Sequence, residues 1–143
     1  MRTIGFGFDK IHIERKKEIK GKLEIKTNIN ITEITKETVD LVKEDVLKFK
    51  FSFSVLYEPG FAELKLDGYV VVIVSQDAVK DLFKHWKKKR IPDYIRLPLF
   101  NFILTKCNIK AMVFEEEFNL PLHVPMPKIM PPQEQSQDAS YVR

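Results

Sequence analysis

The chain has 143 residues, of which 44% are hydrophobic and 31% are charged, as expected for one globular domain rather than a disordered chain. Its single cysteine, Cys107, excludes an intramolecular disulfide and a thiolate metal cluster. No stretch approaches the roughly 20 apolar residues that span a bilayer, and the N-terminus lacks a signal-peptide core. We therefore expect a cytoplasmic protein without membrane insertion.

The first half of the chain alternates between apolar and polar residues, which predicts strands. Apolar residues occupy alternate positions from residue 4 to residue 8, and the apolar phase then moves to Ile11 and Ile13. A change of phase within one strand predicts a bulge, here around Asp9 and Lys10. A second alternating strand over residues 23–32 follows a charged turn and has one wet face.

The third and fourth strands are separated from the second by a polar segment, residues 35–45, which we expect to be a loop or one helical turn tucked in by Val39 and Val42. Alternation returns over residues 47–57.

The tripeptide Glu58-Pro59-Gly60 predicts a tight turn. It leads to a fourth strand over residues 61–75 that is interrupted at Asp67-Gly68. Every residue from Tyr69 to Val74 is apolar, so both faces of this strand should be covered, one of them by a subunit, a ligand or a client.

Two helices are expected in the second half. Ser75 is suited to cap the first, which ends at Pro92, and Pro98 suits the first turn of the second, over residues 98–112. Prolines beyond residue 120 exclude further helix. Four strands followed by two helices predict an α+β fold with an antiparallel sheet. We expect one domain over residues 1–130 and a disordered tail over residues 131–143.

Motifs for catalysis are missing from the sequence. No glycine-rich phosphate loop is present, and no serine, histidine and aspartate ordering indicates a hydrolytic triad. The three histidines, His12, His85 and His123, fall on three different predicted elements without metal-ligand spacing, and Cys107 has the position of an inert core thiol. We expect no enzyme activity, no cofactor and no metal.

The formal net charge of +4 arises mainly from two basic clusters, one over residues 15–26 and one over residues 84–90. Each is either a solvated surface or a site for nucleic acid, an anionic membrane or acidic protein segments. Phe49, Phe51 and Phe53 share one face of a strand whose other face carries lysine and serine, which favours core packing over base stacking. Nucleic-acid binding is therefore expected to be at most non-specific.

The order of several segments over residues 3–130 resembles the SecB export chaperones. The resemblance lies in the opening strand with its change of phase, the acidic lead-in to the third strand, the glycine-bearing fourth strand, the proline-framed crossover loop and the proline-bearing segment after the last helix. These segments are Ile4–Glu14, Lys43–Phe49, Asp67–Ile73, Ile91–Phe100 and Phe118–Leu122.

The resemblance implies a four-stranded antiparallel sheet with two helices on one face, assembly into dimers or tetramers, and hydrophobic grooves that hold unfolded polypeptide without nucleotide. The family's bacterial members are acidic, whereas this chain is basic, and its tail lacks the basic, zinc-assisted element that binds the SecA motor. These departures put coupling to SecA in doubt. They favour a general holdase or a chaperone for one partner.

Three sets of candidate site residues follow. The client-binding groove is expected at Tyr94, Ile95, Leu97, Phe100 and Phe102. The oligomer interface is expected at Tyr69, Val71, Ile73, Leu99 and Ile103. A basic rim is expected at Lys84, Lys87, Lys88, Lys89 and Arg90.

Two other functions fit the same sequence. One is a small apolar-ligand-binding domain in which a curved sheet wraps a helix, and the other is a basic nucleic-acid adaptor. For the five groove side chains, the alternative is that they only close the core of the domain or its dimer interface.

Overall fold

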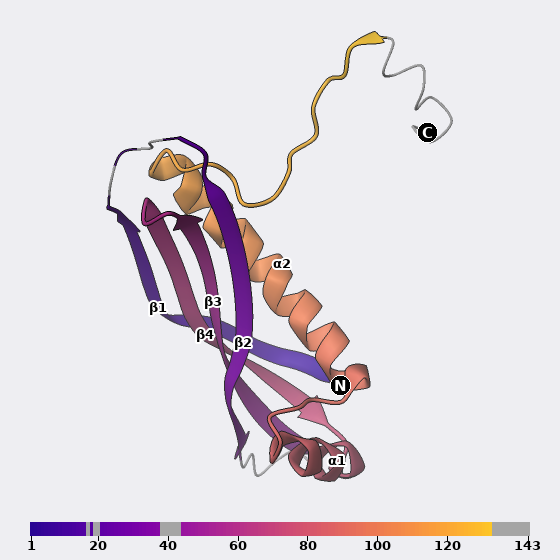
Figure 1. Ribbon diagram of the computed structural model, residues 1–143. Coiled ribbons are helices and arrows are strands. Elements are labelled where there is room, and N and C mark those ends of the chain that lie inside the picture. Colours follow the sequence, from indigo (N-terminus) through magenta and orange to yellow (C-terminus); the bar gives the residue numbers. More distant parts are fainter. Residues whose placement is uncertain (17, 19–20, 38–43, 133–143) are drawn as a thin grey trace.

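The computed structural model describes residues 1–16, 18, 21–37 and 44–132. The elements in chain order are β1 (Arg2–Arg15), β2 (Glu24–Glu37), β3 (Asp45–Glu58), β4 (Ala62–Val74), α1 (Gln76–Trp86) and α2 (Asp93–Glu117). The strands form one antiparallel sheet in the order β1-β4-β3-β2. Helix α2 lies along one face of this sheet and α1 lies at one end of it (Figure 1). The predicted α+β fold with a four-stranded antiparallel sheet is confirmed.

The core lies between α2 and the two central strands. Alternate side chains of β3 and β4 point toward α2 and are buried, because successive residues of a strand face opposite sides of the sheet. Helix α2 meets them with a row of buried residues at four-residue spacing: Ile95, Leu99, Ile103, Cys107, Ala111 and Glu115. The outward face of the sheet carries the alternate residues of β3, many of them lysine and serine.

Helix α2 is 25 residues long, with a mean hydropathy of 1.2 over its most apolar 18-residue window. By length and composition alone, this helix could cross a membrane. The sequence did not predict this, because the apolar residues of the helix are interrupted by polar ones. Core helices of soluble proteins meet the same criterion, and here the four-residue row packs on the sheet. Within that window 22% is fully buried, and other side chains of the helix, such as Phe102 and Leu104, are partly buried against the core.

The bulge predicted near Asp9 is present in β1. The pairing of β1 with β4 shifts between Phe8 and Lys10, and a second shift occurs between Thr3 and Gly5. Because of the shift at Asp9, Phe8 and Ile11 lie on the same face of the sheet, opposite Gly68 and Leu66. Phe8 packs against the core there, and Ile11 is exposed.

The predicted interruption of the fourth strand at Asp67-Gly68 is wrong. Strand β4 is continuous, and its register with β3 does not shift. Glycine is required at residue 68 for a packing reason, because a Cβ there would collide with the Gly7 carbonyl and lie 2.8 Å from the Phe51 ring. The missing side chain admits the Phe51 ring, which stacks on Phe6 at a centroid distance of 5.7 Å.

The second helix begins earlier than predicted, at Asp93 instead of Pro98, and it extends to Glu117. Helix α1 ends at Trp86, before Pro92. Pro92 is instead the N-cap of α2, and its carbonyl accepts hydrogen bonds from the Ile95 and Arg96 amides. Pro98 lies inside the helix, so the residue 94 carbonyl lacks the usual partner amide there.

Predictions for the other boundaries have mixed outcomes. Ser75 caps α1 by accepting a hydrogen bond from the Ala78 amide at 3.3 Å, and Gly60 adopts a φ of 58° in the β3–β4 turn, both as predicted. Strand β2 extends to Glu37 and β3 begins at Asp45, so both ends of the segment 35–45 are strand and not loop or helical turn. Its centre with Val39 and Val42, and the tail beyond residue 132, fall outside the described residues.

Replacing Gly68 with alanine should destabilise the domain by about 1–3 kcal/mol, because the new methyl group has to displace the β1 backbone or the Phe51 ring. Urea denaturation followed by circular dichroism measures the change in free energy of unfolding. Gly5→Ala is the matched control, since its Cβ would meet only Val71 at 3.4 Å and should change stability by less than about 1 kcal/mol. Equal losses in the two variants would contradict this account of Gly68.

Candidate functional site

A groove of about 560 Å³ opens between β2, the connection from α1 to α2, and the first turns of α2. We call it the β2–α2 groove. It is lined by Ile29, Asn30, Ile31, Trp86, Lys89, Arg90, Ile91, Arg96 and Phe100.

Strand β2 supplies one wall of the groove with its edge. It pairs with β3 on one side only, and the backbone hydrogen bonds found among the described residues do not reach its other side. Three consecutive residues, Ile29 to Ile31, line the groove, although neighbouring residues of a strand face opposite sides of the sheet. The wall therefore includes the backbone edge of β2 as well as its apolar side chains.

The opposite wall is shaped by the tight connection after α1. The Lys89 and Arg90 amides donate to the Trp86 and His85 carbonyls at 2.8 and 3.2 Å, and Lys89 adopts a φ of 56°. This turn places the Lys89 ammonium 4.5 Å from the centroid of the Trp86 ring, a cation–π contact, and brings Ile91 to the groove. Apolar side chains thus make up much of the lining, and Phe100 contributes to it from α2.

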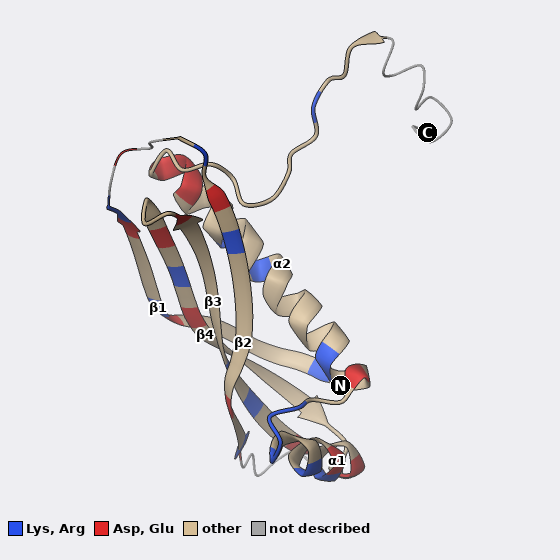
Figure 2. Ribbon diagram, in the orientation of Figure 1, with Lys and Arg blue, Asp and Glu red and all other residues tan. Residues whose placement is uncertain are grey.

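The groove carries positive charge and no carboxylate among its nine lining residues. Lys89, Arg90 and Arg96 belong to the lining, and Arg96 also contacts Asp93 at 3.0 Å on the exposed surface. Figure 2 shows the basic connection between α1 and α2 at one end of the molecule and the acidic end of α2 at the other.

The five residues predicted to form the client groove are not brought together. Phe100 lines the β2–α2 groove, while Tyr94 and Leu97 are exposed on the outer side of α2 and do not line it. Phe102 packs near the other edge of the sheet, 5.7 Å from the Phe6 ring. The prediction for Ile95 is wrong, because this side chain is 2% exposed and belongs to the core.

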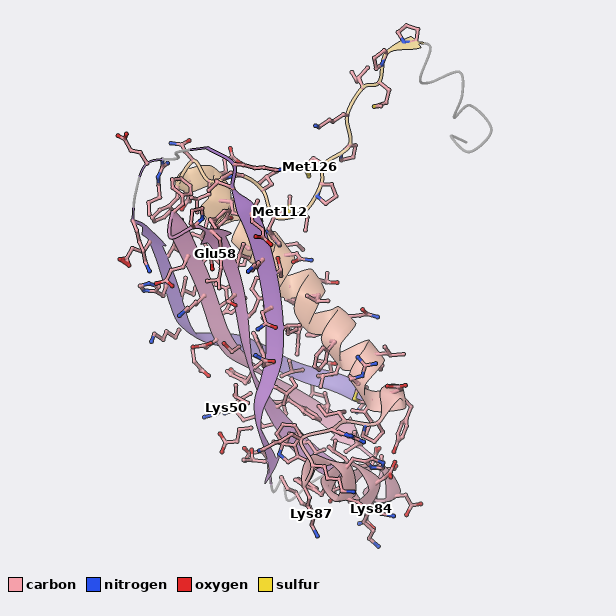
Figure 3. The ribbon with its side chains drawn as sticks, viewed as in Figure 1. Lys50, Glu58, Lys84, Lys87, Met112 and Met126 are labelled. Carbon is pink, nitrogen blue, oxygen red and sulfur yellow. The ribbon has the colours of Figure 1, made fainter. Side chains whose placement is uncertain are left out.

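The predicted basic rim is placed partly at the groove. Lys89 and Arg90 line it. Lys84 and Lys87 project from the end of α1 away from the sheet, and Lys88 is exposed beside them (Figure 3).

Three residues of the predicted oligomer interface are corrected, because they are buried within the chain. Leu99 and Ile103 are 1% and 0% exposed as part of the α2 row that packs on the sheet. Ile73 is 7% exposed on the other face of β4, and Tyr69 and Val71 on that face are partly covered by the chain itself. The Tyr69 ring fills the space left by Gly7 and lies 4.6 Å from the Lys48 ammonium, so part of the expected surplus apolar surface is absent.

Sequence reasoning missed the β2 and connection residues of the groove. Alternation predicts for Ile29 and Ile31 only a strand with one wet face. Helical spacing predicts that Trp86 shares one apolar face of the first helix with Val79, Leu82 and Phe83. A sign of their role was available: a tryptophan at the end of an amphipathic helix is followed at once by four basic residues, Lys87 to Arg90.

The C-terminal strap, residues 118–124, runs back along the sheet from the end of α2. Leu120 is buried in the core, and the Glu115 carboxylate, buried at the end of α2, accepts hydrogen bonds from the Tyr57 hydroxyl and the His123 amide. Both ring nitrogens of His123 face oxygens, Nδ1 at 2.8 Å from Glu115 and Nε2 at 2.8 Å from Asn108. Burial and the bond to Glu115 raise the pKa of Tyr57 above its ordinary value.

The strap ends next to the β2–α2 groove. The His123 ring lies edge-on to Phe53 at a centroid distance of 6.0 Å, and Phe53 pairs with Ile29 of the groove across β3 and β2. After residue 124 the chain leaves the body of the domain (Figure 1), and Met126 lies on this departing segment (Figure 3). The strap therefore packs against β3 through His123, and none of its residues lines the groove.

Two other titratable features carry no site chemistry. His12, Glu14 and Glu63 present ligand atoms within 4.8 Å of one another, but Lys16 and Lys65 lie 3.4 and 3.7 Å from the Glu63 carboxylate, which makes this an ion-pair cluster. Partial burial raises the pKa of Glu63, and the stronger combined effect of His12 and the two lysines lowers it.

Cys107 is a core residue, as predicted. Its thiol is fully buried in the row that α2 packs on the sheet, and burial raises its pKa to about 12. A thiol with this pKa is protonated at neutral pH and is a poor nucleophile.

No family model and no curated protein sequence matches this chain. A solved structure, the Mycobacterium tuberculosis Rv1957 SecB-like chaperone in complex with a ChAD peptide from the Rv1956 HigA1 antitoxin, has a similar fold. The TM-score is 0.51 at 9% sequence identity, and the match covers 91% of each chain. The chain therefore has a SecB-like fold, as the resemblance of its segments implied.

Replacing His123 with alanine should lower the free energy of unfolding by roughly 3–5 kcal/mol, because the buried Glu115 carboxylate loses its ring partner. His12→Ala is the control, since His12 makes an ion pair at the surface and should cost at most about 1 kcal/mol. Urea denaturation at pH 7 measures both. A His123 variant as stable as the His12 variant would show that the strap contributes little to the fold.

Proposed function

We propose that this protein is a nucleotide-independent holdase that binds extended segments of unfolded polypeptide in the β2–α2 groove. The observation that carries the proposal is an apolar groove built along an unpaired strand edge. Such an edge offers main-chain hydrogen bonds to an added strand, and the groove beside it accepts alternate side chains of that strand.

The packing of the strap supports the proposal that the groove binds an extended segment. Leu120 and His123 already pack as a non-helical segment against the sheet. The His123 ring contacts Phe53, whose cross-strand partner is Ile29 of the groove. The space beside the strap is lined by apolar residues of the same kind, and it opens to solvent, so a segment of another chain can enter it without unfolding the domain.

The comparison supports a chaperone-like role in particular. The structurally similar protein is a SecB-like chaperone whose solved structure holds a peptide. We extend this to the present chain as a non-enzymatic, cytoplasmic protein of SecB type, with a general range of clients or a single partner.

Trp86 provides a direct measurement, because it is the sole tryptophan of the chain and lines the groove. Adding an unfolded client should change its fluorescence and slow the client's aggregation without ATP. Phe100→Ser should weaken client binding at least tenfold, since the groove loses one of its two aromatic lining side chains. Ile129→Ser, an exposed change on the departing segment and outside the groove, should bind like the parent.

Circular dichroism has to show that both variants are folded. A folded Phe100 variant that protects the client as well as the parent would contradict the proposal. Tight binding of a small apolar compound, with no effect of unfolded protein on Trp86, would instead favour the ligand-binding alternative.

We also propose that the chain self-associates as a dimer or tetramer through the outer face of α2. Exposed residues at three- or four-residue spacing form an uncharged stripe about 28 Å long on this face. The stripe consists of Tyr94, Leu97, Asn101, Thr105, Ile109 and Val113. Four of these six side chains are large and apolar, and a second copy of the helix would cover them.

Replacing Ile109 and Val113 with glutamate should lower the mass measured by light scattering to that of a smaller species, because each charge would be buried in the helix interface. Ile129→Glu is the matched control, since Ile129 is 96% exposed on the departing segment, away from α2. A parent protein that is monomeric at high micromolar concentration would refute the proposed assembly.

A further inference from the structure

We infer that the β2–α2 groove selects extended segments in which acidic residues alternate with apolar ones. This inference rests on the proposed function and names the class of polypeptide that the groove takes. It follows from the charge of the lining residues, from where the cations stand relative to the apolar interior, and from the unpaired edge of β2.

All three charged side chains of the lining are cationic, and they come from two elements. Lys89 and Arg90 lie on the connection after α1, and Arg96 lies in the first turn of α2. Arg96 also pairs with Asp93 through Nε and Nη2, and its side chain is 43% exposed, so part of the guanidinium is accessible to a ligand. The acidic residues of α2 after Ala111 lie at the opposite end of the helix (Figure 2).

The basic side chains lie next to the apolar side chains in the lining of the groove. The Lys89 ammonium rests on the face of the Trp86 ring, and Ile91 follows Arg90 directly in the sequence. A strand added along Ile29–Ile31 would direct alternate side chains toward the apolar residues. Its neighbouring side chains would meet the basic ones. Arginine binds carboxylates through two parallel hydrogen bonds, and such pairs strengthen where water is partly excluded.

A polypeptide fits this arrangement better than a nucleic acid. The strand edge offers main-chain amides and carbonyls that a second polypeptide backbone matches. The phenylalanines of β3 are buried against α2, so they provide no platform for stacking bases.

Three synthetic 11-residue peptides test the inference, with valine at alternate positions and glutamate, serine or lysine between. Trp86 fluorescence at 50 and 300 mM NaCl gives their dissociation constants. The glutamate peptide should bind at least tenfold more tightly than the serine peptide and the lysine peptide more weakly than both. The order should persist at 300 mM NaCl, because pairs in the groove are less screened than surface charges.

Charge-reversal variants distinguish ion pairing in the groove from attraction by the overall charge of the protein. Arg90→Glu with Arg96→Glu should invert the order of the glutamate and lysine peptides. Lys84→Glu with Lys87→Glu makes the same change in net charge on side chains that project from α1 away from the sheet, and it should keep the parent order (Figure 3).

The outcomes are distinguishable. Equal binding of the three peptides would overturn the charge selection and leave the holdase proposal intact, whereas no binding of any peptide would overturn both. Inversion by the control pair as well would overturn the assignment to the groove. A thymine oligonucleotide that binds more tightly than the glutamate peptide and competes with it would overturn the choice of a polypeptide ligand.

Discussion

The packing of one row of α2 against the buried face of β3 and β4 is the contact on which the rest of this structure depends. The row repeats every four residues, from Ile95 to Glu115, so α2 lies along the central strands and leaves the edge strand β2 only partly covered. The C-terminal strap packs beside α2 on this face of the sheet, held by the buried Glu115 and His123 side chains. The β2–α2 groove remains open between β2 and the start of α2.

The groove therefore results from a helix that is narrower than its sheet. Its apolar lining is an extension of the core, and its basic lining comes from the short connection that has to carry the chain from α1 back over the sheet to α2. Neither feature requires a residue with unusual reactivity, and the one thiol of the chain, Cys107, is sealed within the helix row. Binding by such a surface draws on burial of apolar area and on ion pairing, so it needs no chemical step.

The sequence predicts the elements well and the site poorly, for physical reasons. Alternation of apolar residues reveals strands because each residue reports its own face, and the bulge at Asp9 is visible as a change of phase. In α2, apolar residues occur nearly all round the first turns, so the pattern does not show that Leu99 and Ile103 pack on the sheet while Leu97 faces outward. The groove unites segments separated by more than 50 residues, Ile29–Ile31 and those from Trp86 onward, and only the register of the strands and the path of the connection bring them together.

The unpaired edge of β2 has a consequence for the protein's behaviour toward its own copies. An exposed strand edge is a template for aggregation, and natural sheets protect such edges with charges and bulges. Two copies that met edge to edge at Ile29–Ile31 would each bring Lys89, Arg90 and Arg96 to the same junction, where like charges repel. The bulge between Ile31 and Glu33 further breaks the regular edge. The basic lining thus disfavours pairing of this edge with a second copy of the protein, so the exposed edge does not by itself promote aggregation.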